Sequence, residues 1–324
     1  MFCTLFDSGY LPQGLALLRS LERHVPGMGL WVLAMDDRSH RLLAALQHPQ
    51  LHLLRLEDCE TDELRLARRQ RSWGEYCWTL TPFLPELVLA RDPDAEVVTY
   101  IDADCWLAGP VDSMLNRFQA SGAHCMITPH AYSPHRDRTA TAGTYCVQFM
   151  PFRRTPQALA MLHWWQRRCL EHCSGKLGPG PLGDQGHLED WPVRFGADVF
   201  VLDRPALTLA PWNIERFWQE AATQPCLYHF QGFRLFRLGP LLVIRATAGV
   251  PVPRRAFPLL FTPYLRDILG MLQLLPRAVL APRSLPSPWK DPRGFLLLLP
   301  RLLFLHWCVR LRPLPPAMRG TLRG

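Results

Sequence analysis

The residues Val97-Val98-Thr99-Tyr100-Ile101-Asp102-Ala103-Asp104 combine a strand-like run with a pair of aspartates. The first five residues are β-branched or aromatic, and they predict a buried strand over 97–101. Asp102 and Asp104 follow at the carboxyl end, and residues two apart in a strand lie on the same side. Because carboxylate oxygens bind Mg²⁺ and Mn²⁺, the pair is a candidate metal site. The alternative is an ordinary turn, which is how we interpret the second Asp-x-Asp, Asp92-Pro93-Asp94.

Around this strand, short apolar runs alternate with amphipathic patterns. Further strands are expected at 2–6, 30–35, 51–56, 125–128 and 145–150, and helices at 11–24, 38–47, 62–71, 79–89 and 156–173. This alternation predicts an α/β fold with a mostly parallel sheet and flanking helices. In such sheets ligands bind beyond the carboxyl ends of the strands, which is where Asp102 and Asp104 fall.

Length and composition indicate a globular protein. The 324 residues suffice for one large or two small domains, and 48% hydrophobic with 20% charged residues excludes a disordered chain. The ten cysteines form no Cys-x-x-Cys, which argues against a zinc ribbon or disulfide scaffold and favours a reducing compartment. The first residues show no secretory signal, so we expect a cytoplasmic protein.

The last part of the chain differs from the rest in its charge and in its amino-acid composition. Residues 232–324 hold 15 basic and two acidic side chains, whereas residues 1–231 hold 21 basic and 26 acidic ones. After about residue 249, prolines recur between leucine-rich runs that carry arginine. We therefore expect a catalytic domain over 1–248 and a separate region of short helices over 249–324.

The run from Phe295 to Val309 is apolar and leucine-rich. As a helix its 15 residues would reach about 22 Å, which is short of the roughly 30 Å hydrocarbon core, so it should not span a membrane. Arginines flank it, which suits a segment lying on an anionic lipid surface. The alternative is a helix packed on the catalytic domain. Nucleic acid is disfavoured, because apolar runs separate the arginines.

Four segments together resemble the nucleotide-sugar glycosyltransferases of the GT-A fold. The resemblance is strongest to the retaining group that includes glycogenin and bacterial lipopolysaccharide galactosyltransferases. Besides the segment around Asp102, the matching segments are Cys-Thr-Leu-Phe-Asp-Ser-Gly-Tyr-Leu at 3–11, Gly183-Asp184-Gln185 and His229-Phe230-Gln231-Gly232-Phe233-Arg234. They occur in the family's order and span residues 2 to 234. Glu75-Tyr76-Cys77-Trp78-Thr79 and Ala210-Pro211-Trp212-Asn213 look like a less characterised bacterial branch of this group.

The resemblance implies a metal and a nucleotide-sugar donor. Asp102, Asp104 and His229 would bind Mn²⁺ or Mg²⁺ on the donor diphosphate. The residues implied in binding the rest of the donor, with a UDP-sugar favoured, are Thr4, Leu5, Asp7, Ala103, Gly232 and Arg234. Arg234 stands where the family usually has lysine, which keeps the positive charge near the phosphates. For Thr4, Leu5 and Asp7 the alternative is an ordinary turn capped by Asp7 or Ser8.

The resemblance also implies two residues beside the reacting sugar carbon, Asp184 and Gln185. Asp184 would orient the sugar or the acceptor, and Gln185 would lie on the face opposite the departing diphosphate. The alternative for Asp184 is a helix N-cap. No residue stands out as a covalent nucleophile.

Two positions depart from the family's pattern. Trp78 occupies the place of an arginine that usually contacts the sugar, and Arg71 is the candidate substitute. Cys146 stands where relatives tend to have asparagine, so sugar or acceptor recognition should differ. Trp164, Trp165 and Trp191 fall at helical spacings and are interpreted as core rather than as a sugar-stacking platform.

These observations favour a metal-dependent glycosyltransferase that moves a sugar to an acceptor hydroxyl with retention. The acceptor would be lipid-linked or a glycan, near the inner face of the cell membrane. One alternative is a sugar nucleotidyltransferase, although Asp7-Ser8-Gly9-Tyr10 is not its Gly-rich basic loop. The other is a catalytically decayed, membrane-associated scaffold.

Overall fold

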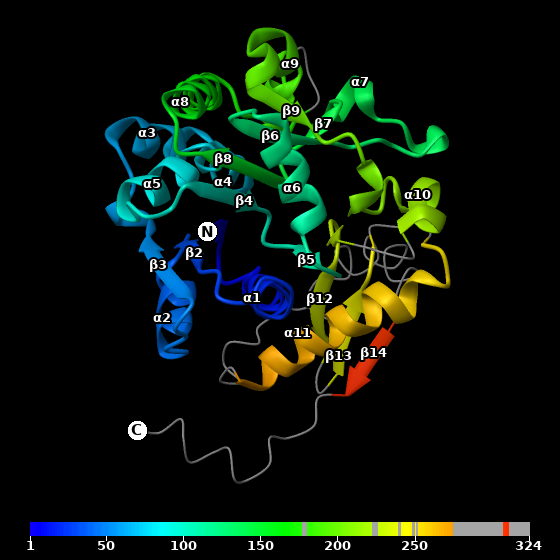
Figure 1. Cartoon of the computed structure of the whole chain (residues 1–324). Coiled ribbons are helices and arrows are strands. Elements are labelled where there is room, and N and C mark those ends of the chain that lie inside the picture. Colours follow the sequence, from blue (N-terminus) through cyan, green and yellow to red (C-terminus); the bar gives the residue numbers. More distant parts are fainter. Residues whose placement is uncertain are drawn as a thin grey trace.

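A computed structural model describes residues 1–176, 180–221, 226–238, 241–247, 250, 252–274 and 307–310 of the chain. It is a mixed α/β structure with helices on both faces of a central sheet (Figure 1). The strands are β1 (Phe2–Phe6), β2 (Leu30–Ala34), β3 (Leu51–Arg55), β4 (Val97–Ile101), β5 (Cys105–Leu107), β6 (Cys125–Pro129), β7 (Tyr145–Cys146), β8 (Phe149–Arg153), β9 (Val199–Val201), β10 (Thr208–Leu209), β11 (Leu227–His229), β12 (Arg234–Leu238), β13 (Leu241–Arg245) and β14 (Trp307–Arg310). The helices are α1 (Leu11–His24), α2 (Asp37–Ala45), α3 (Asp62–Gln70), α4 (Trp73–Leu80), α5 (Phe83–Arg91), α6 (Asp112–Ser121), α7 (Thr139–Ala142), α8 (Pro156–Glu171), α9 (Trp191–Arg194), α10 (Ile214–Ala221) and α11 (Thr262–Leu274).

The central sheet has the strand order β3-β2-β1-β4-β8-β6-β7, with β9 also paired to β6. Strands β3, β2, β1 and β4 run parallel, as does the pair β6 and β9. Only the pairs that involve β7 or β8 are antiparallel among these described strands. The expected α/β fold with a mostly parallel sheet is therefore confirmed. Strand β4 lies in the middle of this order, between β1 and β8.

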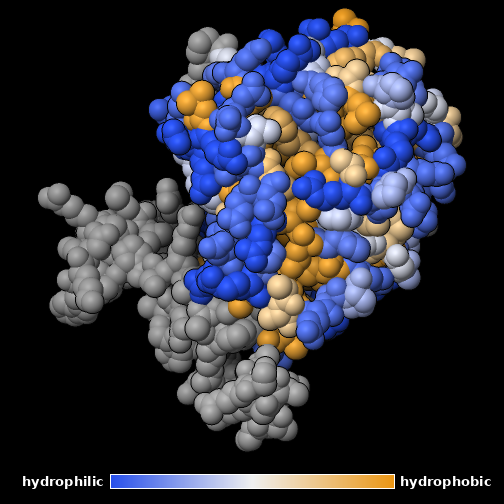
Figure 2. Space-filling view, turned by 90° about the vertical axis from the view of Figure 1, so that its left-hand side faces the viewer, coloured by the Kyte–Doolittle hydropathy of each residue, from blue (hydrophilic) through white to orange (hydrophobic). Residues whose placement is uncertain are grey.

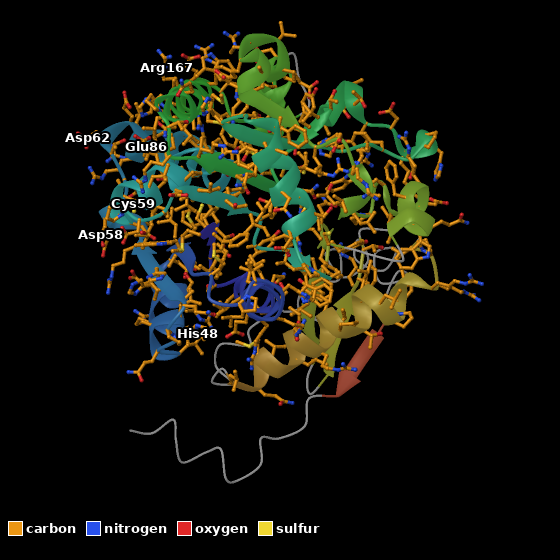
Figure 3. All side chains as sticks on the ribbon, in the orientation of Figure 1. His48, Asp58, Cys59, Asp62, Glu86 and Arg167 are labelled. Atoms are coloured by element: carbon orange, nitrogen blue, oxygen red, sulfur yellow. The ribbon has the colours of Figure 1, made fainter. Side chains whose placement is uncertain are left out.

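Alternate residues of the strands face two different helical layers. In β1, Cys3 and Leu5 join a core with helices α3, α4, α5 and α8, whereas Phe2 and Phe6 join a core with α1, α2 and α6. The helices are amphipathic: Arg167 of α8 and Asp62 of α3 lie at the outer edge of their layer (Figure 3). Trp165 and Trp191 are fully buried in the first core and Trp164 packs against it, as the sequence predicted for all three.

Helix α11 belongs to a third hydrophobic cluster. It lies beside α1 (Figure 1), and its Tyr264 stacks on Phe230 at 3.6 Å between ring centroids. Trp106 of β5 packs in the same cluster. The boundary at residues 248 and 249 stays a prediction, but the described residues 256–272 pack directly on the preceding part of the chain.

The structure corrects three details of the expected elements. Residues 145–150 form two strands, β7 and β8, separated by Val147 and Gln148. The helix expected at 79–89 is the end of α4 plus α5, because Pro82 and Pro85 supply no N–H to continue the helical hydrogen bonds. The start of α4 was missed, although Ser72 and Glu75 form a capping box there.

The apolar run at 295–309 lies outside the described residues except for its last three. Trp307 to Val309 belong to β14, which pairs antiparallel with β13, so this end is a strand rather than the expected helix. Among the described helices, none is long and apolar enough to cross a membrane. The side that lies on the left of Figure 1 is largely hydrophilic with an apolar band across it (Figure 2).

Candidate active site

Asp102 and Asp104 follow β4 in a tight turn. The backbone N–H of Asp102 donates to the carbonyl of Gln148 at 3.2 Å, and the N–H of Cys105 donates to the carbonyl of Asp102 at 2.9 Å. The chain then leaves the central sheet as β5. Asp102 and Asp104 are therefore brought together by a turn, not by the continuous strand that the spacing suggested, and the buried Ala103 lies between them.

His229 reaches the aspartates through the pairing of β11 with β5. The register places His229 opposite Cys105, and the N–H of Phe230 donates to the carbonyl of Asp104 at 2.8 Å. The Nε2 atom of His229 lies 3.0 Å from Oδ1 of Asp104 and 3.8 Å from Oδ2 of Asp102. Ligand atoms of the three residues all lie within 4.8 Å of one another, as the predicted metal site requires.

The charges of this cluster fit a divalent cation. Burial, with the neighbouring charge of Asp104, raises the pKa of Asp102 above its ordinary value. Burial also opposes the charged forms of Asp104 and His229, but their mutual attraction and hydrogen bond outweigh it. The pKa of Asp104 is lowered and that of His229 is raised well above its ordinary value. Two carboxylates and one imidazole are a donor set suited to Mn²⁺ or Mg²⁺, and a cation would relieve the repulsion between the carboxylates.

Asp184 and Gln185 lie near this cluster. Asp184 is 3% exposed, and burial, followed by the negative charge of Asp102, raises its pKa to about 7. Its Oδ1 accepts from the N–H of Gln185 at 2.9 Å, which is the expected cap of a short 3₁₀ helix. Its Oδ2 is buried and has no partner at hydrogen-bonding geometry among the described residues, although the nearby hydroxyl of Thr81 opposes part of the rise in pKa. The side-chain amide of Gln185 donates to the carbonyl of Ala142 at 2.8 Å.

The turn after β1 is held by its own hydrogen bonds. Oδ1 of Asp7 accepts from the N–H groups of Gly9 and Tyr10, and Oδ2 accepts from the indole of Trp73 at 2.9 Å. Thr4 and Leu5 are buried, and Oγ1 of Thr4 has no partner among the described residues. The capped turn is thus present, and nucleotide binding by Thr4, Leu5 and Asp7 stays a prediction.

The segment after His229 places a positive charge between this turn and the aspartates. Gly232 adopts a left-handed φ of +83°, which favours glycine. The guanidinium of Arg234 lies 5.1 Å from the centre of the Tyr10 ring, and its positive charge helps to lower the pKa of Asp104. This position is consistent with the predicted phosphate contact.

Arg71 and Trp78 take different positions in the structure. The guanidinium of Arg71 donates to the hydroxyl of Thr79 and, at 2.5 Å, to the carbonyl of Leu170, so it is engaged in joining helices. Trp78 is 40% exposed and lies against Gly183, where an added Cβ would meet the indole at 3.3 Å. The indole, rather than an arginine, therefore covers the turn that carries Asp184.

No known family model matches the chain. The uncharacterized protein YfnF of Bacillus subtilis (strain 168) is 30% identical over 266 residues, which cover 78% of this chain and 88% of YfnF. The chain belongs to the YfnF family. Uncharacterized protein YfnD of the same organism is 28% identical over 249 residues, covering 72% of this chain and 78% of YfnD.

A solved structure shows the fold of this YfnF-family chain. It is the galactosyltransferase LgtC in complex with donor and acceptor sugar analogs, with a TM-score of 0.52 and 12% identity. The match covers 86% of this chain and 99% of LgtC. The chain therefore has the GT-A glycosyltransferase fold that its four segments indicated.

Three residues at the YfnF-family site were missed in the sequence. The hydroxyl of Tyr100 donates to Oδ1 of Asp102 at 3.0 Å, and Oε1 of Gln148 lies 3.2 Å from Nδ1 of His229. Trp212 packs edge-on against the His229 ring, with 5.3 Å between the centroids. Of these three, only Trp212 belongs to a segment with a recognisable resemblance, Ala210-Pro211-Trp212-Asn213, which looks like the bacterial branch.

Proposed function

We propose that this chain is a metal-dependent glycosyltransferase that moves a sugar from a nucleotide-diphosphate donor to an acceptor hydroxyl, with retention. The convergence of Asp102, Asp104 and His229 at the end of a central strand, in a GT-A fold, carries this proposal. Mn²⁺ or Mg²⁺ held by these three side chains would stabilise the departing diphosphate as a Lewis acid. The complex of LgtC with donor and acceptor sugar analogs supports the assignment of substrate class.

The remaining residues have roles on either side of this cluster. Arg234 would place its guanidinium beside the phosphates, where a delocalised cation suits phosphate oxygens. Thr4, Leu5 and Asp7, with Ala103 and Gly232, would line the nucleotide, and a UDP-sugar is the favoured donor. Asp184 would orient the sugar or the acceptor hydroxyl through its buried Oδ2, and Gln185 would lie opposite the departing diphosphate.

The experiment that tests the proposal is a thermal-shift screen of nucleotide-sugars in the presence of Mn²⁺. A ligand that binds only the native state raises the unfolding temperature, so the donor should stand out from the other nucleotides. The selected donor is then incubated with the protein, and its hydrolysis is measured with Mn²⁺ and with EDTA. Full turnover in EDTA would exclude the metal, and no shift with any donor would favour the decayed scaffold. Once an acceptor has been identified, NMR of the product shows whether the transferred sugar keeps the anomeric configuration of the donor, which tests retention against inversion.

We also propose that the protein acts in the cytoplasm at an anionic membrane surface, close to a lipid-linked or glycan acceptor. The excess of 13 positive charges over residues 232–324 supports this, because each arginine near such a surface contributes about 1 kcal/mol. Since Trp307–Arg310 form β14, deleting the end of the chain would remove a strand. The better test is co-sedimentation of the whole protein with phosphatidylserine vesicles. We expect binding that weakens as salt is raised, and equal recovery with neutral vesicles would contradict the proposal.

A further inference from the structure

The imidazole of His229 is held at both of its nitrogen atoms. Nε2 faces Oδ1 of Asp104 at 3.0 Å, while Nδ1 faces Oε1 of Gln148 at 3.2 Å. Trp212 packs edge-on against the ring. The ring is therefore fixed in an orientation that directs Nε2 into the carboxylate cluster.

Gln148 itself is a buried residue in the break between β7 and β8. It is 0% exposed, and its backbone carbonyl accepts from the N–H of Asp102 at 3.2 Å. Its side chain contacts His229. One residue thus touches two of the three candidate metal ligands, which lie 127 residues apart in the sequence.

A neighbouring hydroxyl decides which end of the Gln148 amide faces His229. The hydroxyl of Thr128 donates to the carbonyl of Cys146 at 3.1 Å, so its oxygen can accept from Nε2 of Gln148 at 3.4 Å. The amide nitrogen therefore faces Thr128, and Oε1 faces Nδ1 of His229. An acceptor at Nδ1 requires a proton on that nitrogen, which reserves Nε2 for a metal.

We propose that Gln148 is the positioning residue of the metal site. Its side-chain oxygen fixes the tautomer and direction of His229, and its backbone carbonyl fixes the turn that carries Asp102. The inference rests on the proposed function, because it assigns Gln148 to the metal site proposed above. It concerns binding of the ion and not contact with the reacting sugar.

The test compares Mn²⁺ affinity among variants, with the free ion measured by electron paramagnetic resonance. Gln148→Met keeps the length of the side chain but removes the acceptor, and we expect Mn²⁺ to bind about tenfold to a hundredfold more weakly. Gln148→Glu restores an acceptor oxygen and should bind Mn²⁺ within about threefold of the wild type. The matched control is Gln166→Met, which removes another buried glutamine that bonds α8 to Pro82 and Glu86. It should leave Mn²⁺ affinity unchanged.

Equal affinity of Gln148→Met and the wild type would overturn the assignment, as would equal weakening by Met and Glu. If instead the wild type binds no Mn²⁺, or Asp102→Asn binds it as well as the wild type, the metal site of the proposed function fails too. If Gln148→Met does not fold, the tautomer of His229 in the wild type tests the proposal instead. Loaded with diamagnetic Zn²⁺, its ¹H–¹⁵N spectrum should show His229 protonated at Nδ1, and a proton on Nε2 instead would overturn the proposal.

Discussion

Carboxylates follow three neighbouring parallel strands at the same edge of the sheet, but they are satisfied in different ways. After β1 and β2, Asp7 and Asp36 accept hydrogen bonds from nearby backbone N–H groups, and Asp7 also accepts from the indole of Trp73. Both carboxylate oxygens of each residue therefore have a donor. After β4, Asp102 has one hydroxyl donor and a histidine that it shares with Asp104. Asp184, close by, has a buried oxygen without a partner among the described residues.

This contrast shows that position at the end of a strand does not identify a functional carboxylate. Backbone N–H groups, joined at Asp7 by the indole of Trp73, supply the donors that the charges of Asp7 and Asp36 need, so both residues stabilise their turns. The nucleotide contact proposed for Asp7 would be made in addition to this role. At Asp184 a backbone N–H reaches only Oδ1, and Asp102 accepts instead from the hydroxyl of Tyr100; burial raises the pKa of both carboxyls. A group that folding leaves unsatisfied is one for which a cation or substrate can provide the missing interaction.

The largest effect is expected where the carboxylates share His229. Asp102→Asn or Asp104→Asn should lower turnover by about 10³-fold or more, because a ligand and a negative charge of the metal site are lost together. The measurement is donor hydrolysis with Mn²⁺, alongside circular dichroism to verify the fold. Turnover near the wild-type value in either variant would show that the carboxylate concerned is no more functional than those that stabilise turns.

Asp184→Asn distinguishes a carboxylate that acts on the substrate from one that only caps the 3₁₀ helix. Asparagine caps a helix about as well as aspartate, so the 3₁₀ helix should persist. If Oδ2 acts on the substrate, turnover should fall by about 10²-fold while binding of the nucleotide alone stays close to wild type. A silent variant would leave Asp184 with the structural carboxylates.

The same variant makes a prediction about stability and pH. The unfolded Asp184 carboxyl titrates near 3.8 and the folded one at about 7, so the folded state binds the proton more tightly. Stability from this group is therefore full below about pH 4 and falls as the pH rises to about 7. In EDTA, Asp184→Asn should be more stable than the wild type by about 4 kcal/mol at pH 8, with the difference shrinking towards pH 4. Chemical denaturation at several pH values measures it, and a constant difference would contradict the assigned pKa.

The smallest effect is expected at Asp36. Oδ1 caps α2 through the N–H of Ser39, and Oδ2 accepts from the N–H and hydroxyl of Ser8. Asp36→Asn should cost about 1 kcal/mol of stability, because an amide replaces one of these acceptors. Turnover should stay within about threefold of the wild type. A loss of turnover as large as that of Asp102→Asn would show that Asp36 is part of the site.

Some of the site could be predicted from local patterns and some could not. The strand 97–101 and its two aspartates were visible because β-branched and aromatic residues directly precede the acids. Gln148 was not visible, since its pattern continued an apolar strand over 145–150 and nothing local marked the break. The resemblance implied Arg71 as a sugar contact, yet its guanidinium joins the end of α3 to Leu170 of α8, which lies 99 residues away in the sequence.

By itself, the sequence determined the alternation of strands and helices, the burial of β4 and the identity of the carboxylates, because these depend on periodicity and residue type over a few positions. Only the tertiary structure determined which of the charged and polar side chains lie in contact at the site. The pairing of β11 with β5 sets His229 beside Asp104, and the break at Gln148 sets the orientation of that imidazole. Such contacts join residues that lie 81 apart in the sequence (Gln148 and His229) or further apart (Asp104 and His229), so no local pattern encodes them. They arise because each polar group that the packed sheet buries must find a hydrogen-bond partner among the few groups that lie next to it.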